Sequence, residues 1–256
     1  MSGPREVAKV VLPTSFGEFD ARAYECPSGA VHLAMVRGPV SGVRSVLTRL
    51  HSECLTGDAL GSLRCDCGLQ LTEGLRAIAA EGRGVLLYAP GHEGRGIGLV
   101  NKLRAYVEQD RGADTVDANT RLGLPVDGRL YDEAAAVLRA LGIRSVRLLT
   151  NNPEKVRGLR DNGVPVDRVE PIRTAAHVRN RRYLDAKTRR LGHRPPTGPP
   201  LEDASGDPVD VSGLIGRGSS PSWRPRVVLN SMRPAIQVSS PSRAETRAAA
   251  CVSPCC

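Results

Sequence analysis

Three cysteines in the first third of the chain have the spacing of ligands to a single metal ion. Cys54, Cys65 and Cys67 lie in the stretch HSECLTGDALGSLRCDCGLQL. Two cysteines one residue apart can bind the same ion from a tight loop, and Cys54 can complete the triangle. Zinc prefers thiolate and imidazole ligands, and a site with three protein ligands keeps a fourth position for water. Bound zinc lowers the pKa of water to about 7, so the pattern predicts a hydrolytic site.

Two other interpretations of this stretch are weaker. Three buried thiols without a metal are one alternative, but a Cys-Asp-Cys segment flanked by glycine and charges is a poor core segment. A zinc deaminase would combine the His-x-Glu pattern of His51 and Glu53 with Pro-Cys-x-x-Cys, which the sequence lacks. His51 and Glu53 could still contact a base and handle a proton, or they could be surface groups.

Two polar turns have the character of anion-binding sites. Residues 91–98 (GHEGRGIG) lie between a predicted buried strand and a predicted helix, where backbone N–H groups can bind an anion and Arg95 adds a guanidinium. Residues 150–153 (TNNP), followed by Lys155, repeat the order of strand end, polar turn and helix start. Ligands of α/β sheets gather at strand carboxyl ends, so the two turns support each other. An ordinary tight turn is an equal alternative for the first, which matches neither the P-loop nor the dinucleotide pattern.

The segments around these turns alternate between strand-like and helix-like patterns. Apolar and β-branched runs predict strands at residues 6–12, 18–24, 31–36, 43–50, 85–88 and 145–149. Helical periodicity predicts helices at residues 70–80, 99–109 and 132–141, from about residue 153, and at 176–191. Two of these helices carry an apolar stripe on one face: Leu71, Leu75 and Ile78 in the first, and Val100, Leu103 and Val107 in the second.

This order of elements predicts the fold class and the domain limits. Strands first, then strand–helix alternation, predict an α/β fold with helices packed on a mixed sheet and an antiparallel β layer at the N-terminus. Of the 19 prolines, 10 fall after residue 194, together with many serines and little apolar periodicity. We expect a folded domain at residues 1–194 and a disordered Pro/Ser-rich tail at 195–256. The tail cysteines, Cys251, Cys255 and Cys256, are interpreted as unstructured thiols rather than ligands.

Composition narrows the choice of partners. The net charge is +9, but aromatic residues make up only 3% of the chain. Nucleic-acid sites cluster basic residues with stacking aromatics, whereas here the basic residues are scattered, so we expect no nucleic-acid partner. No stretch approaches 18 apolar residues and the N-terminus lacks a signal-peptide core, so we expect no membrane span and a cytoplasmic location. Seven cysteines without a regular framework fit a reducing compartment, where cysteine clusters are more often metal ligands or catalysts.

Taken together, three stretches resemble the GTP cyclohydrolase II family. They are SGVRSVLTRLHSECLTGDALGSLRCDCGLQL, GHEGRGIGLVNKLRAYVEQD and RLLTNNPEKV, and the similarity runs from the N-terminus to about residue 194. The resemblance implies zinc-dependent hydrolysis of GTP that opens the imidazole ring. The implied products are 2,5-diamino-6-(5-phosphoribosylamino)pyrimidin-4(3H)-one, formate and diphosphate, in the first step of riboflavin biosynthesis. It also implies one Zn²⁺ per chain, Mg²⁺ with the triphosphate, and a homodimer.

The resemblance also implies roles for individual residues. Cys54, Cys65 and Cys67 match the zinc ligands. The positions that match the GTP-binding residues are Arg49, Leu50, His51, Ser52, Glu53, Gln70, Glu93, Gly94, Arg95, Thr115, Thr150 and Lys155.

Three further residues match positions close to the reaction. Asp127 matches the proposed proton acceptor, Arg129 the proposed nucleophile and Tyr106 a tyrosine near the purine. From spacing alone, Asp127 and Arg129 would be an ordinary turn with an exposed ion pair. A guanidinium has a pKa above about 12 and is a poor nucleophile, so stabilisation of phosphate charge is an equally good role for Arg129.

Two alternatives stay open at the level of sequence. A paralogue of the family could stop at the formylated pyrimidine or serve a specialised pathway, although Tyr106 favours the full reaction. An alternative of another class is a zinc-stabilised nucleic-acid-binding module.

Overall fold

A computed structural model describes residues 3–195 of the chain. Residues 1–2 and 196–256 lie outside the described residues, and with them all but the first residue of the predicted tail and its three cysteines. The elements are β1 (Arg5–Thr14), β2 (Gly17–Glu25), β3 (Val31–Arg37), β4 (Val46–Ser52), α1 (Leu55–Asp58), α2 (Cys67–Glu81), β5 (Gly84–Ala89), the 3₁₀ turn η1 (Glu93–Arg95), α3 (Gly98–Asp110), α4 (Thr115–Arg121), α5 (Asp132–Ala140), β6 (Val146–Leu149), α6 (Pro153–Asp161), β7 (Val166–Glu170) and α7 (Arg181–Leu191).

All seven strands belong to one sheet, in the order β1-β2-β3-β5-β4-β6-β7. β1, β2, β3 and β5 pair in antiparallel fashion, and β5, β4, β6 and β7 pair in parallel. The predicted α/β class with a mixed sheet is confirmed. The antiparallel strands at the N-terminus are continuous with the parallel half, because β3 pairs directly with β5.

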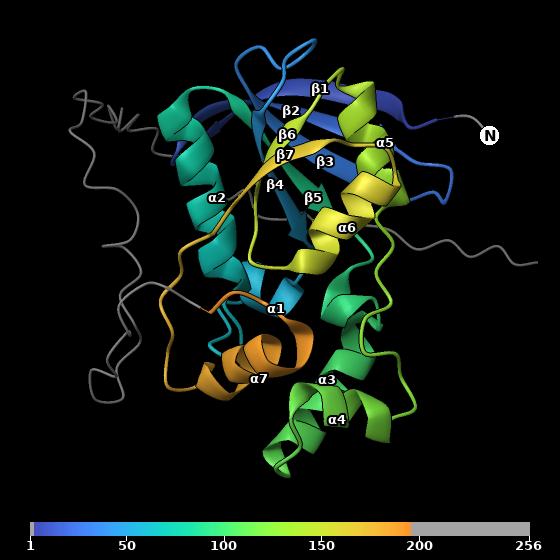
Figure 1. The fold of residues 1–256 in the computed structure, drawn as a ribbon, viewed down its shortest axis with the longest axis vertical. Coiled ribbons are helices and arrows are strands. Elements are labelled where there is room, and N and C mark those ends of the chain that lie inside the picture. The colour runs from blue at the N-terminus through green and yellow to red at the C-terminus, as the bar shows by residue number, and fades with distance from the viewer. Residues whose placement is uncertain (1–2, 196–256) are drawn as a thin grey trace, which may run out of the picture. The chain divides into compact units, whose positions relative to one another are not determined.

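Helices cover the parallel half of the sheet on both faces (Figure 1). On the face of α2, Ile78 is fully buried and belongs to one apolar cluster with Leu86 of β5. On the face of α5 and α6, Val85 and Leu87 of the same strand belong to a second cluster with Leu138. Side chains alternate along a strand, so a continuous apolar run such as β5 fills both cores.

Sequence signals at the helix ends explain where several helices begin and end. α6 begins at Pro153, which needs no partner for a backbone N–H in the first turn. Asn152 precedes it, and its side-chain oxygen accepts a hydrogen bond from the N–H of Glu154 at 2.9 Å. α2 ends at Gly82, whose left-handed backbone (φ 73°) suits glycine. The predicted start of the last helix was too early, because α7 begins at Arg181 and a turn precedes it.

The apolar stripe on the predicted helix at residues 99–109, which is α3, does not face the core. Val100, Leu103 and Val107 are 63%, 48% and 49% exposed, whereas Lys102 and Ala105 are buried. The reason is electrostatic: Lys102 pairs with a buried carboxylate under the helix, and this turns the polar side of α3 inward. The stripe of α2, in contrast, packs as predicted, with Leu71 and Leu75 partly buried beside Ile78.

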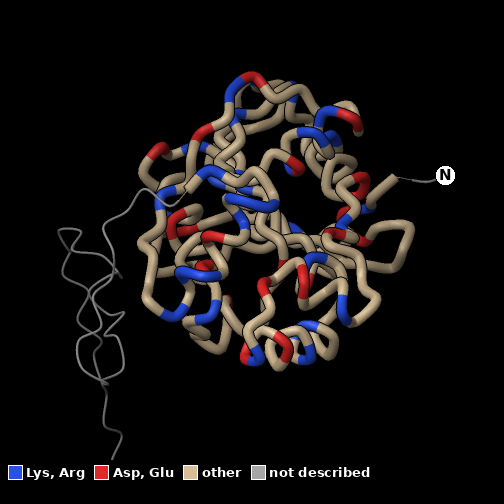
Figure 2. Tube along the Cα trace, turned by 60° about the horizontal axis from the view of Figure 1, so that its bottom comes forward, with Lys and Arg blue, Asp and Glu red and all other residues tan. Residues whose placement is uncertain are grey.

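Basic and acidic residues are interspersed along the chain trace of the described residues (Figure 2). This view agrees with the scattered basic residues of the sequence. No helix among residues 3–195 combines the length and the apolar character that crossing a lipid bilayer requires.

Candidate active site

A pocket opens at the carboxyl ends of the parallel strands β4 and β6. This position is the usual one for ligand sites in α/β sheets. Fifteen of the predicted site residues line it: Arg49, His51, Ser52, Glu53, Cys54, Cys65, Cys67, Gln70, Gly94, Arg95, Tyr106, Thr115, Arg129, Thr150 and Lys155.

The three cysteines meet at one side of this pocket. Their sulfur atoms lie within 4.8 Å of one another, and the sulfurs of Cys54 and Cys65 are 3.7 Å apart. Two sulfurs that each lie about 2.3 Å from a tetrahedral zinc ion are about 3.8 Å apart, so the spacing fits this ion. Hydrogen bonds from the thiols of Cys65 and Cys67, together with the ammonium of Lys102, lower the pKa of the Cys54 thiol.

Gly57 leaves room for the three sulfurs. A methyl group in place of its hydrogen would lie 2.7 Å from the sulfur of Cys65 and 3.1 Å from that of Cys54. Both separations are too short for carbon and sulfur in contact. The donor set and the space kept by Gly57 therefore both fit a metal ion.

Asp58 fixes the loop that carries Cys54. Its carboxylate accepts hydrogen bonds from the backbone N–H of Cys54 (3.0 Å) and from the hydroxyl of Tyr88 (3.0 Å). The imidazole Nε2 of His51 lies 3.0 Å from the same carboxylate, and the ring stacks on Tyr88. Burial lowers the pKa of His51. Asp58 is more than nine-tenths buried; it lies inside the cysteine stretch at residues 51–71, although the sequence alone indicates no role for it.

Lys102 connects α3 to the metal loop. Its ammonium donates to the sulfur of Cys54 (3.0 Å), to the hydroxyl of Thr56 (2.8 Å) and to the carboxylate of Glu93 (2.6 Å). Glu93 also accepts a hydrogen bond from the N–H of Leu55 at 2.7 Å. Glu93 therefore does not line the pocket. It lies behind the pocket wall and positions α1 and Lys102.

A second group of metal-ligand types lies among the described residues. The sulfur of Cys26 is 3.5 Å from Nδ1 of His32, and Glu133 lies close to both. Burial raises the pKa of the Cys26 thiol to about 11. Both carboxylate oxygens of Glu133 accept hydrogen bonds from Ser28. Cys26, His32 and Glu133 thus have hydrogen-bond partners within the protein. In this respect the group differs from the cysteine triangle, which faces the pocket.

Two buried cations stand under the turn that follows β6. Arg49 donates to the carbonyl of Leu149 (3.0 Å) and to the side chain of Gln70 (2.6 Å), and burial lowers its pKa to about 10. Lys155 donates to the carbonyl of Leu50 at 2.8 Å. Burial, with the charges of Arg49 and Arg129 nearby, lowers the pKa of Lys155. Leu50 thus contributes its backbone to the site, while its side chain is in the core.

The side chain of Arg95 is free to bind an anion. It is buried, and neither terminal nitrogen of its guanidinium has a hydrogen-bond partner among the described residues. The backbone of Arg95 is left-handed (φ 65°), a conformation that is strained for a residue with a side chain. Strained backbone of this kind is concentrated at functional sites. The glycines on either side, Gly94 and Gly96, also have positive φ. The turn therefore aims Arg95 into the pocket.

Asp127 and Arg129 form an ion pair, as spacing alone suggests, in which the Arg129 side chain is 8% exposed and the Asp127 side chain 25% exposed. The Arg129 Nε donates to Asp127 at 2.9 Å, and a second guanidinium nitrogen pairs with the same carboxylate. Burial disfavours the charge of Arg129, but the hydrogen bond from Arg129 to Asp127 outweighs it and raises the pKa of Arg129. Ser52 links this pair to His92, whose Nε2–H donates to the carbonyl of Leu130.

Several residues at the pocket escaped the sequence analysis. The polar ones are His92, Lys102, Gln109, Asn119, Tyr183, Lys187 and His193, whereas Asn151 and Asn152 belong to the predicted turn at residues 150–153. His92 lies inside the glycine-rich turn and could have been found there. Tyr183 and Lys187 lie one turn apart on α7, but their pattern does not differ from that of a solvated helix.

Comparison with known proteins assigns the family. A family model described as GTP cyclohydrolase II matches residues 5–171, which contain every predicted site residue. The chain belongs to the GTP cyclohydrolase II family. The resemblance seen in three sequence motifs is therefore confirmed.

Relatives of GTP cyclohydrolase II type occur in several bacteria. GTP cyclohydrolase-2 of Neisseria meningitidis is 51% identical over 187 residues, which cover 73% of this chain and 94% of the relative. The riboflavin biosynthesis protein RibBA of Salinispora tropica is 54% identical over 188 residues. That match covers 73% of this chain and 47% of RibBA, so the chain spans about half the length of this relative. A solved structure of RibBX, a two-domain 3,4-dihydroxy-2-butanone 4-phosphate synthase from A. baumannii, matches with a TM-score of 0.38 and 19% identity, over 68% of this chain and 41% of that one.

Proposed function

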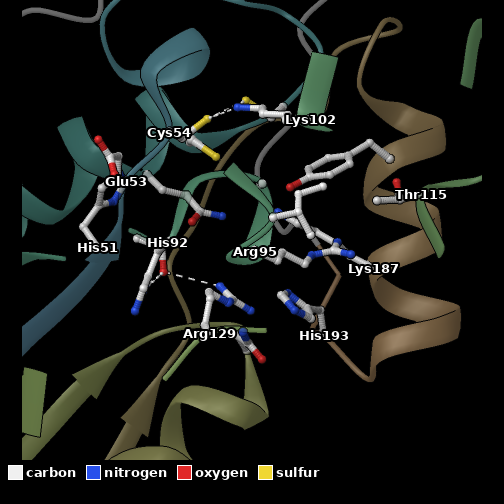
Figure 3. Close-up of a pocket in the computed structure, with 18 of the residues that line it drawn as sticks. His51, Glu53, Cys54, His92, Arg95, Lys102, Thr115, Arg129, Lys187 and His193 are labelled. Atoms are coloured by element: carbon white, nitrogen blue, oxygen red, sulfur yellow. Dashed lines mark hydrogen bonds between the residues drawn. The ribbon is translucent and has the colours of Figure 1, made fainter. Parts of the chain in front are cut away.

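We propose that this GTP cyclohydrolase II family member hydrolyses GTP with the help of zinc. The imidazole ring opens, and the products are 2,5-diamino-6-(5-phosphoribosylamino)pyrimidin-4(3H)-one, formate and diphosphate, which begins riboflavin biosynthesis. One observation carries the proposal: the cysteine triangle and the unpartnered guanidinium of Arg95 line the same pocket. A metal held by the cysteines would then share the pocket with the Arg95 cation, whose side chain Figure 3 shows together with Cys54.

The cysteine triangle supplies the hydrolytic end of the site. Cys54, Cys65 and Cys67 would hold zinc, which lowers the pKa of water to about 7 and so makes hydroxide available at neutral pH. Glu53 and His51 come from the end of β4 beside the triangle, and a hydrogen bond from the N–H of Gly91 holds the Glu53 carboxylate at 2.8 Å. We assign these two side chains to guanine recognition and proton handling.

The cations supply the phosphate end. Arg95 offers the N–H groups of its two unpartnered terminal nitrogens, Lys155 adds an ammonium, and Mg²⁺ bound with the triphosphate would offset further charge. Thr115 and Thr150 line the pocket and offer hydroxyl groups near these cations. Gln70 is held by Arg49 and so presents its amide at a fixed angle.

Arg129 fits electrostatic stabilisation better than nucleophilic attack. Its pairing with Asp127 raises the pKa of the guanidinium, so the group stays protonated. The same pairing lowers the pKa of Asp127, so this residue is a carboxylate near neutral pH. We therefore propose that Arg129 stabilises developing negative charge and that Asp127 orients it. Tyr106 lines the pocket beside Lys102 and would contact the purine.

The remaining features of the proposal concern assembly and location. We propose a homodimer, as the family resemblance implies, and exposed Val10, Val11 and Leu12 of the edge strand β1 offer an apolar surface for it. We place the chain in the cytoplasm, whose reducing conditions keep cysteine ligands available for metal. The domain at residues 1–194 would carry the activity.

Product analysis tests the proposed function. The purified chain, loaded with zinc and incubated with GTP and Mg²⁺, should release formate and diphosphate, and a zinc chelator should stop the release. Mass spectrometry of the pyrimidine separates the full reaction from one that stops at the formylated product. Unchanged GTP absorbance with zinc bound would refute the enzyme. Salt-sensitive oligonucleotide binding that survives Cys54→Ser would support a nucleic-acid-binding module instead.

A further inference from the structure

The last described helix and the residues after it complete the wall of the pocket. We name residues 181–195 the C-terminal arm. This arm lies beyond residues 5–171, the segment that the family model matches. Tyr183, Lys187 and His193 of the arm line the pocket together with Arg95 and Arg129. In Figure 3 the labelled side chains of the arm lie across the pocket from the sulfur atoms.

Lys187 joins the arm to the loop that carries two of the cysteines. Its ammonium donates to the carboxylate of Asp66 at 3.0 Å, and Asp66 stands between Cys65 and Cys67. The other oxygen of Asp66 accepts from Gln70 at 2.6 Å. The side chains of Lys187 and Asp66 are 11% and 3% exposed, so the pair is shielded from water and fixed in place.

Lys187 has donors left over after this ion pair. An ammonium has three N–H groups, and among the described residues its hydrogen bonding is to Asp66 alone. The nitrogen also lies 4.2 Å from the ring centroid of Tyr183, a cation–π distance. The guanidinium carbon of Arg95 in turn lies over the ring of Tyr183, 5.9 Å from the ring centroid. The free donors of Lys187 and the free guanidinium nitrogens of Arg95 therefore belong to one cationic wall.

His193 stands at the end of this wall. Its backbone N–H donates to the carbonyl of Lys187 (3.2 Å), and the next residue, Arg194, donates to the carbonyl of Asn151 (3.0 Å). These two bonds fix the imidazole over the turn that follows β6. Burial and the charges of Lys187, Arg95, Arg129 and Lys155 lower the pKa of His193 to about 3. Because four cations surround this neutral imidazole, this end of the pocket favours the binding of a polyanion.

We propose that Lys187 and His193 of the C-terminal arm bind the polyphosphate of the substrate beside Arg95. The proposal rests on the proposed function for the identity of the nucleotide, whereas the ligand chemistry, a linear phosphate chain, follows from the cationic wall. Lys187 contacts phosphate with its free donors while Asp66 holds it. The same lysine therefore connects the phosphate end to the cysteine loop.

Binding titrations on the zinc-loaded full chain test this assignment without needing turnover. The two probes are inorganic diphosphate with Mg²⁺, which carries only the phosphate chemistry, and guanosine, which carries none of it. Lys187→Met and His193→Ala should each weaken diphosphate binding about 10- to 100-fold, the effect of losing a hydrogen bond to a charged group. Guanosine binding should stay within about twofold, and zinc per chain should not change.

A matched variant on the same helix controls for the loss of a positive charge. Arg189 is exposed and, within residues 3–195, pairs with Asp185 on its own helix, so Arg189→Met should leave diphosphate binding unchanged. Lys187→Arg should recover part of the affinity, because it keeps both the charge and the contact with Asp66. The proposal is overturned if both arm variants bind diphosphate as the parent chain does. It is also overturned if Lys187→Met loses zinc, guanosine and diphosphate together while His193→Ala loses none, because the arm would then serve only as a brace.

A second readout follows the imidazole itself. In NMR titrations of the five histidines, the His193 signal, assigned from the His193→Ala variant, should show a pKa that rises from about 3 when diphosphate binds. A bound anion offsets the surrounding cations and favours the imidazolium. A His193 pKa that ignores saturating diphosphate contradicts the contact. If diphosphate binds as expected but GTP is never turned over, the arm assignment stands and the proposed function fails.

Discussion

Lys102 and Glu93 form an ion pair of 2.6 Å whose two side chains are both more than nine-tenths buried. The ammonium also donates to the sulfur of Cys54, so a charge on α3 reaches the metal loop directly. Burying two charges is costly, and the pair is stable only while both partners are present. α3 is thereby fixed to the cysteine triangle by charge rather than by apolar packing.

Removing one partner of this pair should destabilise the fold. Lys102→Met leaves the Glu93 carboxylate buried without its cation, and we expect the free energy of unfolding to fall by about 3–5 kcal/mol, measured by urea denaturation. The double variant Lys102→Met/Glu93→Gln should recover part of that loss, because the uncompensated charge is gone. Strictly additive effects in the double-mutant cycle would show that the two side chains are not coupled.

Gly57 should be needed for metal binding. Gly57→Ala places a methyl group 2.7 Å from the sulfur of Cys65, so the sulfurs must separate and the triangle must open. We expect zinc per chain, measured by atomic emission spectroscopy, to fall well below that of the parent chain. Gly3→Ala is the matched control, because its methyl group would meet nothing within 4 Å. Full zinc occupancy in Gly57→Ala would mean that the sulfurs do not share one ion.

The parts of this fold that local patterns specify were predictable from sequence. The run of residues 85–88 predicts a buried strand because it consists of three aliphatic residues and a tyrosine, and β5 lies there. The helix that starts at Pro153 was predictable because Asn152 and the proline are both signals of a helix N-terminus. The cysteine triangle was readable because Cys65 and Cys67 are nearly adjacent and few other functions use that pattern.

What the sequence could not predict depends on contacts between distant segments. Lys102 points inward because its ammonium binds Glu93 and the sulfur of Cys54. Periodicity alone indicated an apolar stripe on the opposite face of α3. Lys187 meets Asp66 across 121 residues of chain, so no local pattern marks either as a site residue. The strand β7 escaped because only its first residue is fully buried, which leaves no apolar run to detect.

Stability should depend on pH through the buried histidine His92. Burial, with the nearby charge of Lys155, lowers its pKa from 6.5 to about 4. The unfolded chain then binds more protons than the folded one between these values, so this contribution is complete above about pH 6.5 and is lost as pH falls towards 4. We expect the urea midpoint to drop over that window, and less steeply in His92→Gln. Identical pH profiles of the two chains would exclude His92 as a contributor.

The paired N–H donors of the Arg129 guanidinium should be needed for catalysis. Arg129→Lys keeps the charge but loses the paired contact with Asp127, so we expect kcat to fall by about 100- to 1,000-fold with a smaller change in KM. Asp127→Asn should reduce kcat in the same direction, because the guanidinium loses its orienting carboxylate. Steady-state formate release provides the measurement. A lysine variant with the kcat of the parent chain would show that a point charge suffices at this position.

Truncation separates the tail from the C-terminal arm. A chain that ends at residue 195 keeps every pocket residue described here, so we expect it to retain zinc and turnover. A chain that ends at residue 171, the limit of the family model, lacks Tyr183, Lys187 and His193 of the pocket wall. We expect this shorter chain to lose turnover, even if circular dichroism shows that its sheet forms. Because the two chains differ by only 24 residues, comparable rates of formate release from both would mean that the pocket is complete without the arm and that Lys187 is dispensable.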